Sequence, residues 1–174
     1  VIVIVGLGNG LEGYVTDSFS DMGTNTLTVS VESRGSTRTL EEDGMYEMVE
    51  ENAAYLEACS PTVSMSGTVK IGTETTSSSV TGVSEEYFSM MGYEVASGRG
   101  LQYSDIAQRS KVCVVGAYLS LAYFGGDAVG ETIRVGGQNL TIVGVLAQRG
   151  EDMEEGGSDD CVYLPYSTAS RLSG

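Results

Sequence analysis

Among the residue types that carry out catalysis, histidine is absent from this chain. Without an imidazole the chain lacks the usual general base near neutral pH and the commonest metal ligand. Ser-His-Asp, Cys-His and His-based zinc chemistry are therefore excluded. Neither catalysis nor a metal site is expected, and the protein is predicted not to be an enzyme.

The three cysteines, Cys59, Cys113 and Cys161, form no C-x-x-C pair. Neither a zinc ribbon nor a thioredoxin-like site is therefore predicted. Cys113 lies within an apolar run and is expected to be a small core residue. Cys59 and Cys161 border polar stretches, and these are the two that would form a disulfide in an oxidising compartment.

A glycine-rich motif near the N-terminus offers an alternative function. Gly8, Gly10 and Gly13 have the G-x-G-x-x-G spacing, and Glu32 follows about twenty residues later, where a ribose-binding acid would lie. Such glycines let the backbone approach a pyrophosphate at a helix N-terminus. The rest of the chain lacks a succession of parallel βαβ units, and later hairpin patterns indicate antiparallel strands. A dinucleotide-binding domain is kept as an alternative.

A group of carboxylates occupies the loop predicted over 148–160. It lacks the D-x-[DN]-x-[DN]-G spacing of a calcium loop, so no metal site is predicted there. The formal net charge of the chain is −15, which disfavours nucleic acid and favours docking of a cationic peptide or an extracytoplasmic partner protein at this loop. The acidic group consists of Glu151, Asp152, Glu154, Glu155, Asp159 and Asp160.

The elements that must position these residues follow from periodicity. Apolar residues make up 41% of the 174 residues, which is enough for a core, and 24 glycines against two prolines favour an α+β domain with many tight turns. Helical spacing and period-two alternation mark the elements. Helices are predicted over 11–22, 39–57, 85–91, 104–108, 117–124 and from 167; strands over 26–31, 63–71, 73–82, 111–115, 132–135, 140–146 and 161–164.

A series of short motifs runs along nearly the whole chain, and its order and spacing are more specific than any one motif. It resembles the MacB-like periplasmic core domain family, the extracytoplasmic part of FtsX-like permeases of ABC transporters. The motifs are Met22-Gly23-Thr24-Asn25, Val80-Thr81-Gly82-Val83-Ser84 with Tyr87-Phe88, Gly98-Arg99, Lys111 to Gly116, Val129-Gly130-Glu131-Thr132-Ile133, Val143-Gly144-Val145-Leu146 and Val162 to Thr168.

The resemblance implies a two-lobed α+β fold, in which a mixed α/β lobe is inserted into a porter-like βαβ lobe. Residues 1–8 would be the outer end of a transmembrane helix or the start of an expressed fragment. Residues 9–81 would form the first part of the porter-like lobe and 82–160 the inserted lobe. Residues 161–174 would return to the porter-like lobe, which is shortened relative to the family.

The resemblance also implies a non-catalytic function outside the bacterial cell membrane, on the periplasmic or extracellular side. A separate cytoplasmic ABC ATPase subunit or domain would hydrolyse ATP, and this domain would itself hold no cofactor. Movement of this domain would drive export or extraction of peptide, lipoprotein or antibiotic-type cargo. The transporter would contain a second copy of the permease. A secreted partner-binding module is the remaining alternative.

Overall fold

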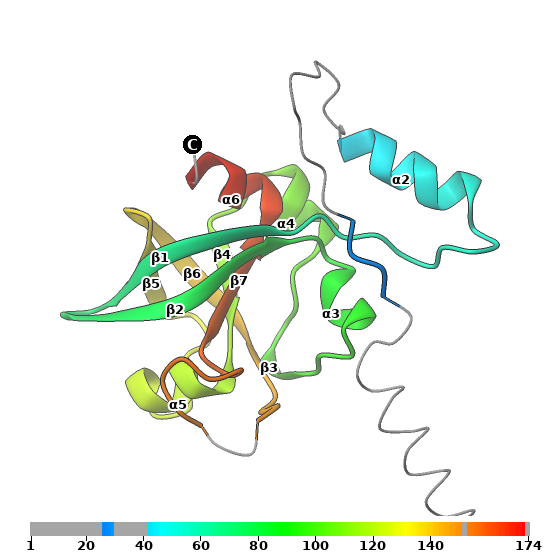
Figure 1. Cartoon of the computed structure of the whole chain (residues 1–174). Helices are drawn as coiled ribbons and strands as arrows, with labels where there is room; N and C mark the ends of the chain where they lie inside the picture. Colours follow the sequence, from blue (N-terminus) through cyan, green and yellow to red (C-terminus); the bar gives the residue numbers. More distant parts are fainter. Residues whose placement is uncertain (1–25, 30–41, 151–152, 173–174) are drawn as a thin grey trace, which may run out of the picture. The chain divides into compact units, whose positions relative to one another are not determined.

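The computed structural model describes residues 26–29, 42–150 and 153–172 (Figure 1). The glycine motif at Gly8, Gly10 and Gly13 and the helix predicted over 11–22 therefore lie outside the described residues. Contacts divide the chain into two compact units, each described by itself below. One comprises Val1–Cys59 with Ser89–Gly92, and the other comprises Ser60–Phe88 with Tyr93–Gly174.

The first unit contains the helix α2 (Glu42–Glu51), which ends earlier than the predicted residue 57. The Asn52 side chain donates a hydrogen bond of 2.8 Å to the carbonyl of Met48, and turns follow over 52–55. An asparagine side chain that bonds a backbone carbonyl in this way competes with the next helical hydrogen bond. The spacing of apolar residues does not predict this local effect.

The strand predicted over 26–31 is wrong for the part that the structure describes. Residues 26–29 have no regular secondary structure, and Leu27 and Val29 are 83% and 72% exposed. Alternating apolar residues form a strand only when a neighbouring strand pairs with them. Among the described residues no strand pairs with 26–29.

The second unit is built on a mixed sheet of seven described strands in the order β3-β6-β4-β7-β2-β1-β5. Strand β5 also pairs with β6, so six strands close into a ring and β3 is added beside β6. The strands are β1 (Val63–Ile71), β2 (Glu74–Val83), β3 (Val95–Gly98), β4 (Val112–Val115), β5 (Thr132–Val135), β6 (Gln138–Leu146) and β7 (Cys161–Pro165).

Two antiparallel hairpins confirm the period-two predictions. Strands β1 and β2 pair from Val63 opposite Gly82 to Ile71 opposite Glu74. Strands β5 and β6 pair through a two-residue turn at Gly136 and Gly137, whose φ angles are +55° and +83°. Both φ angles lie in the region that favours glycine, as this hairpin turn requires.

The ring of strands encloses the main core. Its inward side chains are apolar at alternate positions, as on β1 and β5, and most of them are fully buried. The short, continuously buried strand β7 lies between β2 and β4, parallel to β2 and antiparallel to β4. Core members include Val69, Val80, Val115, Leu119, Ile133, Leu140, Ile142, Val162 and Leu164.

Four short helices connect and cover this sheet: α3 (Tyr87–Met90), α4 (Tyr103–Ala107), α5 (Ala117–Phe124) and α6 (Tyr166–Leu172). Two hydroxyl groups of α6 bind the chain at the end of α4 and just after it. Ser167 Oγ donates a hydrogen bond of 2.7 Å to the carbonyl of Ile106, and Thr168 Oγ1 donates one of 3.1 Å to the carbonyl of Ser110. Ala169 of α6 is fully buried in the main core.

The unit that carries the sheet draws on segments far apart in sequence. The predicted boundary at residue 82 falls within β2, and residues from both sides of it contribute strands to the one sheet. The assignment of 9–81 and 161–174 to a porter-like lobe and of 82–160 to an inserted lobe stays a prediction. The α+β fold class is confirmed by the mixture of helices and paired strands.

Candidate functional site

Four glycines of the sequence motifs lie where a neighbouring segment approaches too closely for a side chain: Gly82, Gly98, Gly116 and Gly144. A Cβ atom at Gly98 would overlap the carbonyl oxygen of Val143, and one at Gly144 would overlap that of Arg99. These two glycines lie opposite each other where β3 pairs with β6, and they allow the close approach of the two backbones there. Gly82 would meet Ala169 in the same way, and Gly116 would meet the carbonyl of Asp159.

Arg99, which follows the first of these glycines, is held by a carboxylate. Its guanidinium donates to Asp105 Oδ2 at 2.6 Å and to Oδ1 at 3.2 Å, and Asp105 also accepts from the backbone N–H of Gln102 at 3.0 Å. Asp105 is thus both the partner of Arg99 and part of the capping box at the start of α4. The pair joins β3 to α4.

The ionisation of Asp105 reflects these contacts. Burial raises the pKa of Asp105, but the hydrogen bonds from Arg99 and from the Gln102 N–H, with the charge of Arg99, outweigh burial. The pKa of Asp105 is therefore held below its usual range, and the carboxylate is charged at neutral pH.

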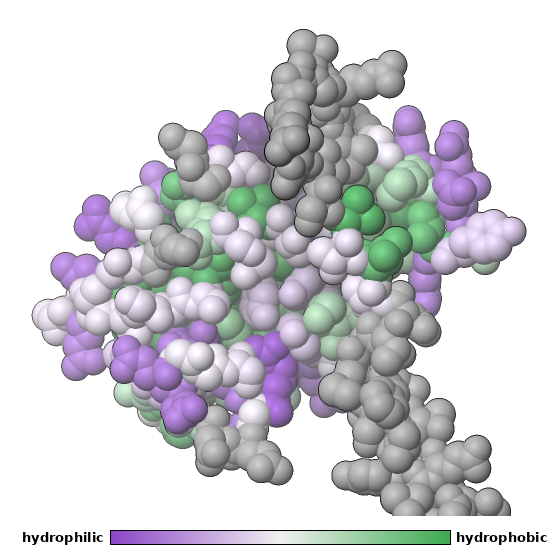
Figure 2. All heavy atoms as spheres, in the orientation of Figure 1, coloured by the Kyte–Doolittle hydropathy of each residue, from purple (hydrophilic) through white to green (hydrophobic). Residues whose placement is uncertain are grey.

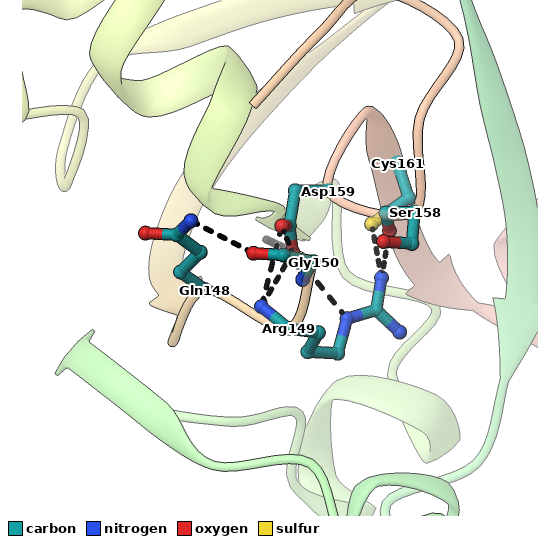
Figure 3. A network of polar contacts seen from close by, with 6 residues as sticks. All are labelled: Gln148, Arg149, Gly150, Ser158, Asp159 and Cys161. Atoms are coloured by element: carbon teal, nitrogen blue, oxygen red, sulfur yellow. Dashed lines mark hydrogen bonds and ion pairs between the residues drawn. The ribbon is translucent and has the colours of Figure 1, made fainter. Parts of the chain in front are cut away.

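A second arginine organises the loop between β6 and β7, as Figure 3 shows. The Arg149 guanidinium lies 4.2 Å from the centre of the Tyr93 ring and donates to Cys161 Sγ at 3.2 Å and to the carbonyl of Ser158. Its Nε lies 3.6 Å from Asp159 Oδ1. The side chain therefore contacts the far end of its own loop and the aromatic ring before β3.

Asp159 closes the base of this loop. It is 1% exposed and accepts hydrogen bonds from the backbone N–H groups of Arg149 at 3.0 Å and of Gly150 at 2.9 Å. Neighbouring Asp160 is equally buried and accepts from the N–H of Gly156 at 2.8 Å. Asp159 and Asp160 thus tie the end of the loop to its start and to Gly156.

Aromatic rings surround the Arg149 side chain. Tyr87, Phe88, Tyr93 and Tyr163 lie with ring centres 5.5–6.2 Å apart. Burial raises the pKa of Tyr163 and of Tyr87, so both phenols are neutral at neutral pH. Phe88 is a buried member of the second hydrophobic cluster, and Tyr87 packs against that cluster. Tyr123 and Phe124 likewise pack against the main core.

The acidic group predicted from sequence is divided by the structure. Glu154 and Glu155 are exposed, whereas Asp159 and Asp160 are buried and bind backbone N–H groups of their own loop. Glu151 and Asp152 lie outside the described residues. Docking of a partner at this group stays a prediction, and within the described residues its solvent-facing members are Glu154 and Glu155.

The cysteines are free thiols in this structure. Cys113 is fully buried in the core, as expected, and burial raises its pKa. Burial also raises the pKa of Cys161 to about 11, against the opposing effect of Arg149. Cys59 belongs to the other compact unit, and its pairing with Cys161 stays a prediction.

Two structural features are absent among the described residues. No group of three or more cysteine, aspartate or glutamate side chains there is arranged to hold a metal ion. Within the same residues, no helix combines the length and the apolar character needed to cross a bilayer.

The sequence prediction missed both arginine contacts. Arg99 was singled out only as part of a Gly-Arg motif, and Arg149 was not singled out at all. A signal was available, because the chain has nine basic residues against 24 acidic ones. A basic residue beside an acidic loop in such a chain is a candidate for an internal ion pair.

The whole chain is similar to known proteins. The family model of the MacB-like periplasmic core domain matches residues 1–174. The chain is 30% identical to the macrolide export ATP-binding/permease protein MacB of Chromobacterium violaceum and 31% identical to that of Vibrio parahaemolyticus. The matches cover 100% and 98% of this chain but only 28% and 27% of those proteins, so the chain spans about a quarter of their length.

Solved structures share the fold at lower identity. The periplasmic region of MacB from Actinobacillus actinomycetemcomitans superposes with a TM-score of 0.68 at 23% identity, over 89% of this chain and 72% of that one. The extracellular domain of the noncanonic ABC-type transporter YknZ from Gram-positive bacteria gives a TM-score of 0.61 at 17% identity, over 75% and 64% of the two chains. The chain belongs to the MacB-like periplasmic core domain family of ABC-transporter permeases.

Proposed function

We propose that this domain is the extracytoplasmic transmission element of an ABC transporter, and that it carries out no chemistry itself. A cytoplasmic ATPase subunit or domain of the same transporter hydrolyses ATP, and the permease moves this domain outside the membrane as a body. The curated relatives are named as ATP-binding/permease proteins, which supports an ATPase partner. The transporter contains two permease copies.

The closure of the sheet supports the proposal that this domain transmits movement. Six strands drawn from residues 63–165 pair in a ring, and motif glycines let segments distant in sequence pack without intervening side chains. A ring of strands with a packed core resists bending, because interiors packed to crystal density transmit strain. Such a body passes on a displacement applied at one point to its far surface.

For cargo, we propose a macrolide-type antibiotic as the first class to test, since both relatives are named for macrolide export. Peptides and lipoproteins are the other classes that the family resemblance implies. The dinucleotide-binding alternative has no support in the sheet described here, where most strand pairs are antiparallel. The secreted-module alternative is set aside because the chain belongs to a permease family.

The test uses the whole parent transporter with its ATPase in a strain that lacks macrolide exporters. We expect it to raise the inhibitory concentration of erythromycin, and we expect Gly116→Val to abolish that effect while ATP hydrolysis by the purified transporter continues. Gly116 has no room for a side chain, whereas the matched control Thr75→Val lies on the exposed face of β2 and should act as wild type.

Protein amounts are compared by immunoblot, and folding of the domain by limited proteolysis. Full resistance with a domain that proteolysis shows to be unfolded would refute mechanical transmission. A wild-type transporter that hydrolyses ATP without exporting macrolide would refute the cargo class, and peptide and lipoprotein substrates would then be assayed.

A further inference from the structure

Helix α5 (Ala117–Phe124) has an unusual composition for its position in the molecule. It contains no charged residue, in a chain whose formal net charge is −15. One side of the helix is anchored, because Leu119 is fully buried and Tyr118, Tyr123 and Phe124 pack against the main core. The other side is open: Leu121 is 56% exposed and Ala122 is also exposed.

Carboxylates border this apolar helix. Asp127 comes three residues after the end of the helix and is exposed. Glu155 is exposed on the loop between β6 and β7. Burial is the largest cause of the raised pKa of the Tyr118 phenol, and the charges of Tyr123, Glu155 and Asp160 raise that pKa further. Figure 1 shows the segment 153–160 in orange beside α5.

The backbone ties the acidic loop to the start of α5. The N–H of Gly116, the residue that precedes the helix, donates to the carbonyl of Cys161 at 2.9 Å, and Gly116 lies directly against the carbonyl of Asp159. The Arg149 and Asp159 contacts described above close the base of this loop. Glu154 and Glu155 are therefore presented next to α5 by a clamped turn.

In the space-filling view the same region shows green and purple spheres side by side, over α5 and the neighbouring loop (Figure 2). An exposed leucine alone is ordinary on a protein surface. An uncharged helix face with carboxylates along its borders is a different pattern, because it matches a ligand that carries apolar residues on one face and cations on the other.

We propose that the exposed face of α5, bordered by Glu155 and Asp127, is a docking surface for a basic amphipathic helical segment of a partner protein. Leu121 and Ala122 contact the apolar face of that segment, and the two carboxylates pair with its lysine or arginine side chains. The charge of the chain selects this occupant: a second copy would bring carboxylates against carboxylates, and an anionic membrane surface would be repelled.

This surface goes beyond the proposed transport function and does not depend on the cargo. The test measures binding of the 174-residue chain to a labelled leucine–lysine peptide about four turns long, with leucines at helical spacing, by fluorescence anisotropy. Two control peptides have the same residues in scrambled order, or glutamate in place of each lysine. Analytical ultracentrifugation of the chain alone is run in parallel.

We expect the leucine–lysine peptide to bind and both control peptides to bind at least about tenfold more weakly. Leu121→Ser should weaken binding about fivefold, because about half of a leucine's burial is lost. The matched control Tyr103→Ser changes an exposed apolar residue on α4 and should leave binding unchanged. Glu155→Gln should weaken binding at low salt and flatten its salt dependence, whereas Glu74→Gln, at the β1–β2 turn, should not.

Three outcomes would overturn the proposal. Equal losses from Leu121→Ser and Tyr103→Ser, or from Glu155→Gln and Glu74→Gln, would show that the peptide responds only to the overall surface. Binding of the scrambled peptide as tight as that of the leucine–lysine peptide would show that helical spacing of the leucines is not recognised. A dimer of the chain that Leu121→Ser dissociates would make a second copy the occupant. The result of the transport assay affects none of these readings.

Discussion

Replacing Gly116 by alanine tests whether the motif glycines serve close backbone contact. Gly116 has φ −73° and ψ 164°, a conformation that alanine adopts freely. At such a position Gly→Ala ordinarily stabilises a protein by about 0.4–1 kcal/mol, through the unfolded chain. At Gly116 a Cβ atom would overlap the carbonyl of Asp159 and crowd Cys161 Sγ, so the backbone must shift.

The expected change in the free energy of unfolding combines two destabilising contributions with one stabilising contribution. Overpacking costs about 1–3 kcal/mol, and weakening the hydrogen bond from the Gly116 N–H to the Cys161 carbonyl adds about 1 kcal/mol. After subtraction of the unfolded-state gain, we expect Gly116→Ala to lower the free energy of unfolding by about 2 kcal/mol. In a domain of this size that lowers Tm by about 4–8 °C.

The assay is thermal and urea unfolding followed by circular dichroism, with two control glycines. Gly44 in α2 has open space around it, so Gly44→Ala should stabilise its helix by about 0.5–1 kcal/mol. Gly137 also has open space but a φ of +83°, so Gly137→Ala should cost about 1 kcal/mol from conformation alone. A Gly116→Ala chain as stable as wild type, or more stable, would refute the close-contact explanation.

Three other predictions concern the described contacts. Asp105→Ala removes the Arg99 and Gln102 hydrogen bonds and should cost about 2 kcal/mol at pH 7, whereas exposed Asp127→Ala should cost less than about 0.5 kcal/mol. The pKa of Asp105 in the folded chain lies below its ordinary value of 3.8. The difference in stability between the wild type and Asp105→Ala should therefore be complete above pH 3.8 and shrink as the pH falls through the lowered folded pKa. A stability difference that persists at the lowest pH would contradict the ion pair. Leu164→Ala empties a fully buried site and should cost about 2–5 kcal/mol, against less than about 1 kcal/mol for half-exposed Leu121→Ala, and equal costs would contradict the described core. Under reducing conditions a thiol reagent should modify Cys59 rapidly but Cys113 and Cys161 only on unfolding, because both are buried and the pKa of Cys161 is about 11; rapid reaction of Cys161 would contradict its burial, and loss of the fast thiol under oxidising conditions would support its pairing with Cys59.

Much of the fold was predictable because its elements follow from local patterns. Period-two alternation located β1, β2, β5 and β6, and the Gly136-Gly137 pair located the turn between the last two. Two local predictions were wrong, because a side-chain hydrogen bond ends one element and a pairing strand is missing for the other among the described residues. The helix α2 ends at Glu51, where Asn52 bonds the Met48 carbonyl, and residues 26–29 form no strand because none of the described strands pairs with them.

The candidate site was predictable only in outline. The acidic group was identified from sequence, but its division into exposed Glu154 and Glu155 and buried Asp159 and Asp160 was not, because charge composition does not show which carboxylates meet backbone N–H groups. The partner of Arg149 also could not be predicted. Its contacts with Tyr93 and Cys161 join parts of the chain that only the sheet brings together.

The sequence by itself determined the family, the α+β class, the absence of histidine chemistry and the positions of the motif glycines, because each depends on residue identity and spacing along the chain. Only the tertiary structure decided which glycines abut which carbonyls, how β5 closes the ring onto β6, and that the exposed face of α5 lies beside the acidic loop. These features depend on packing between segments distant in sequence, where the deciding quantity is the space left between backbones.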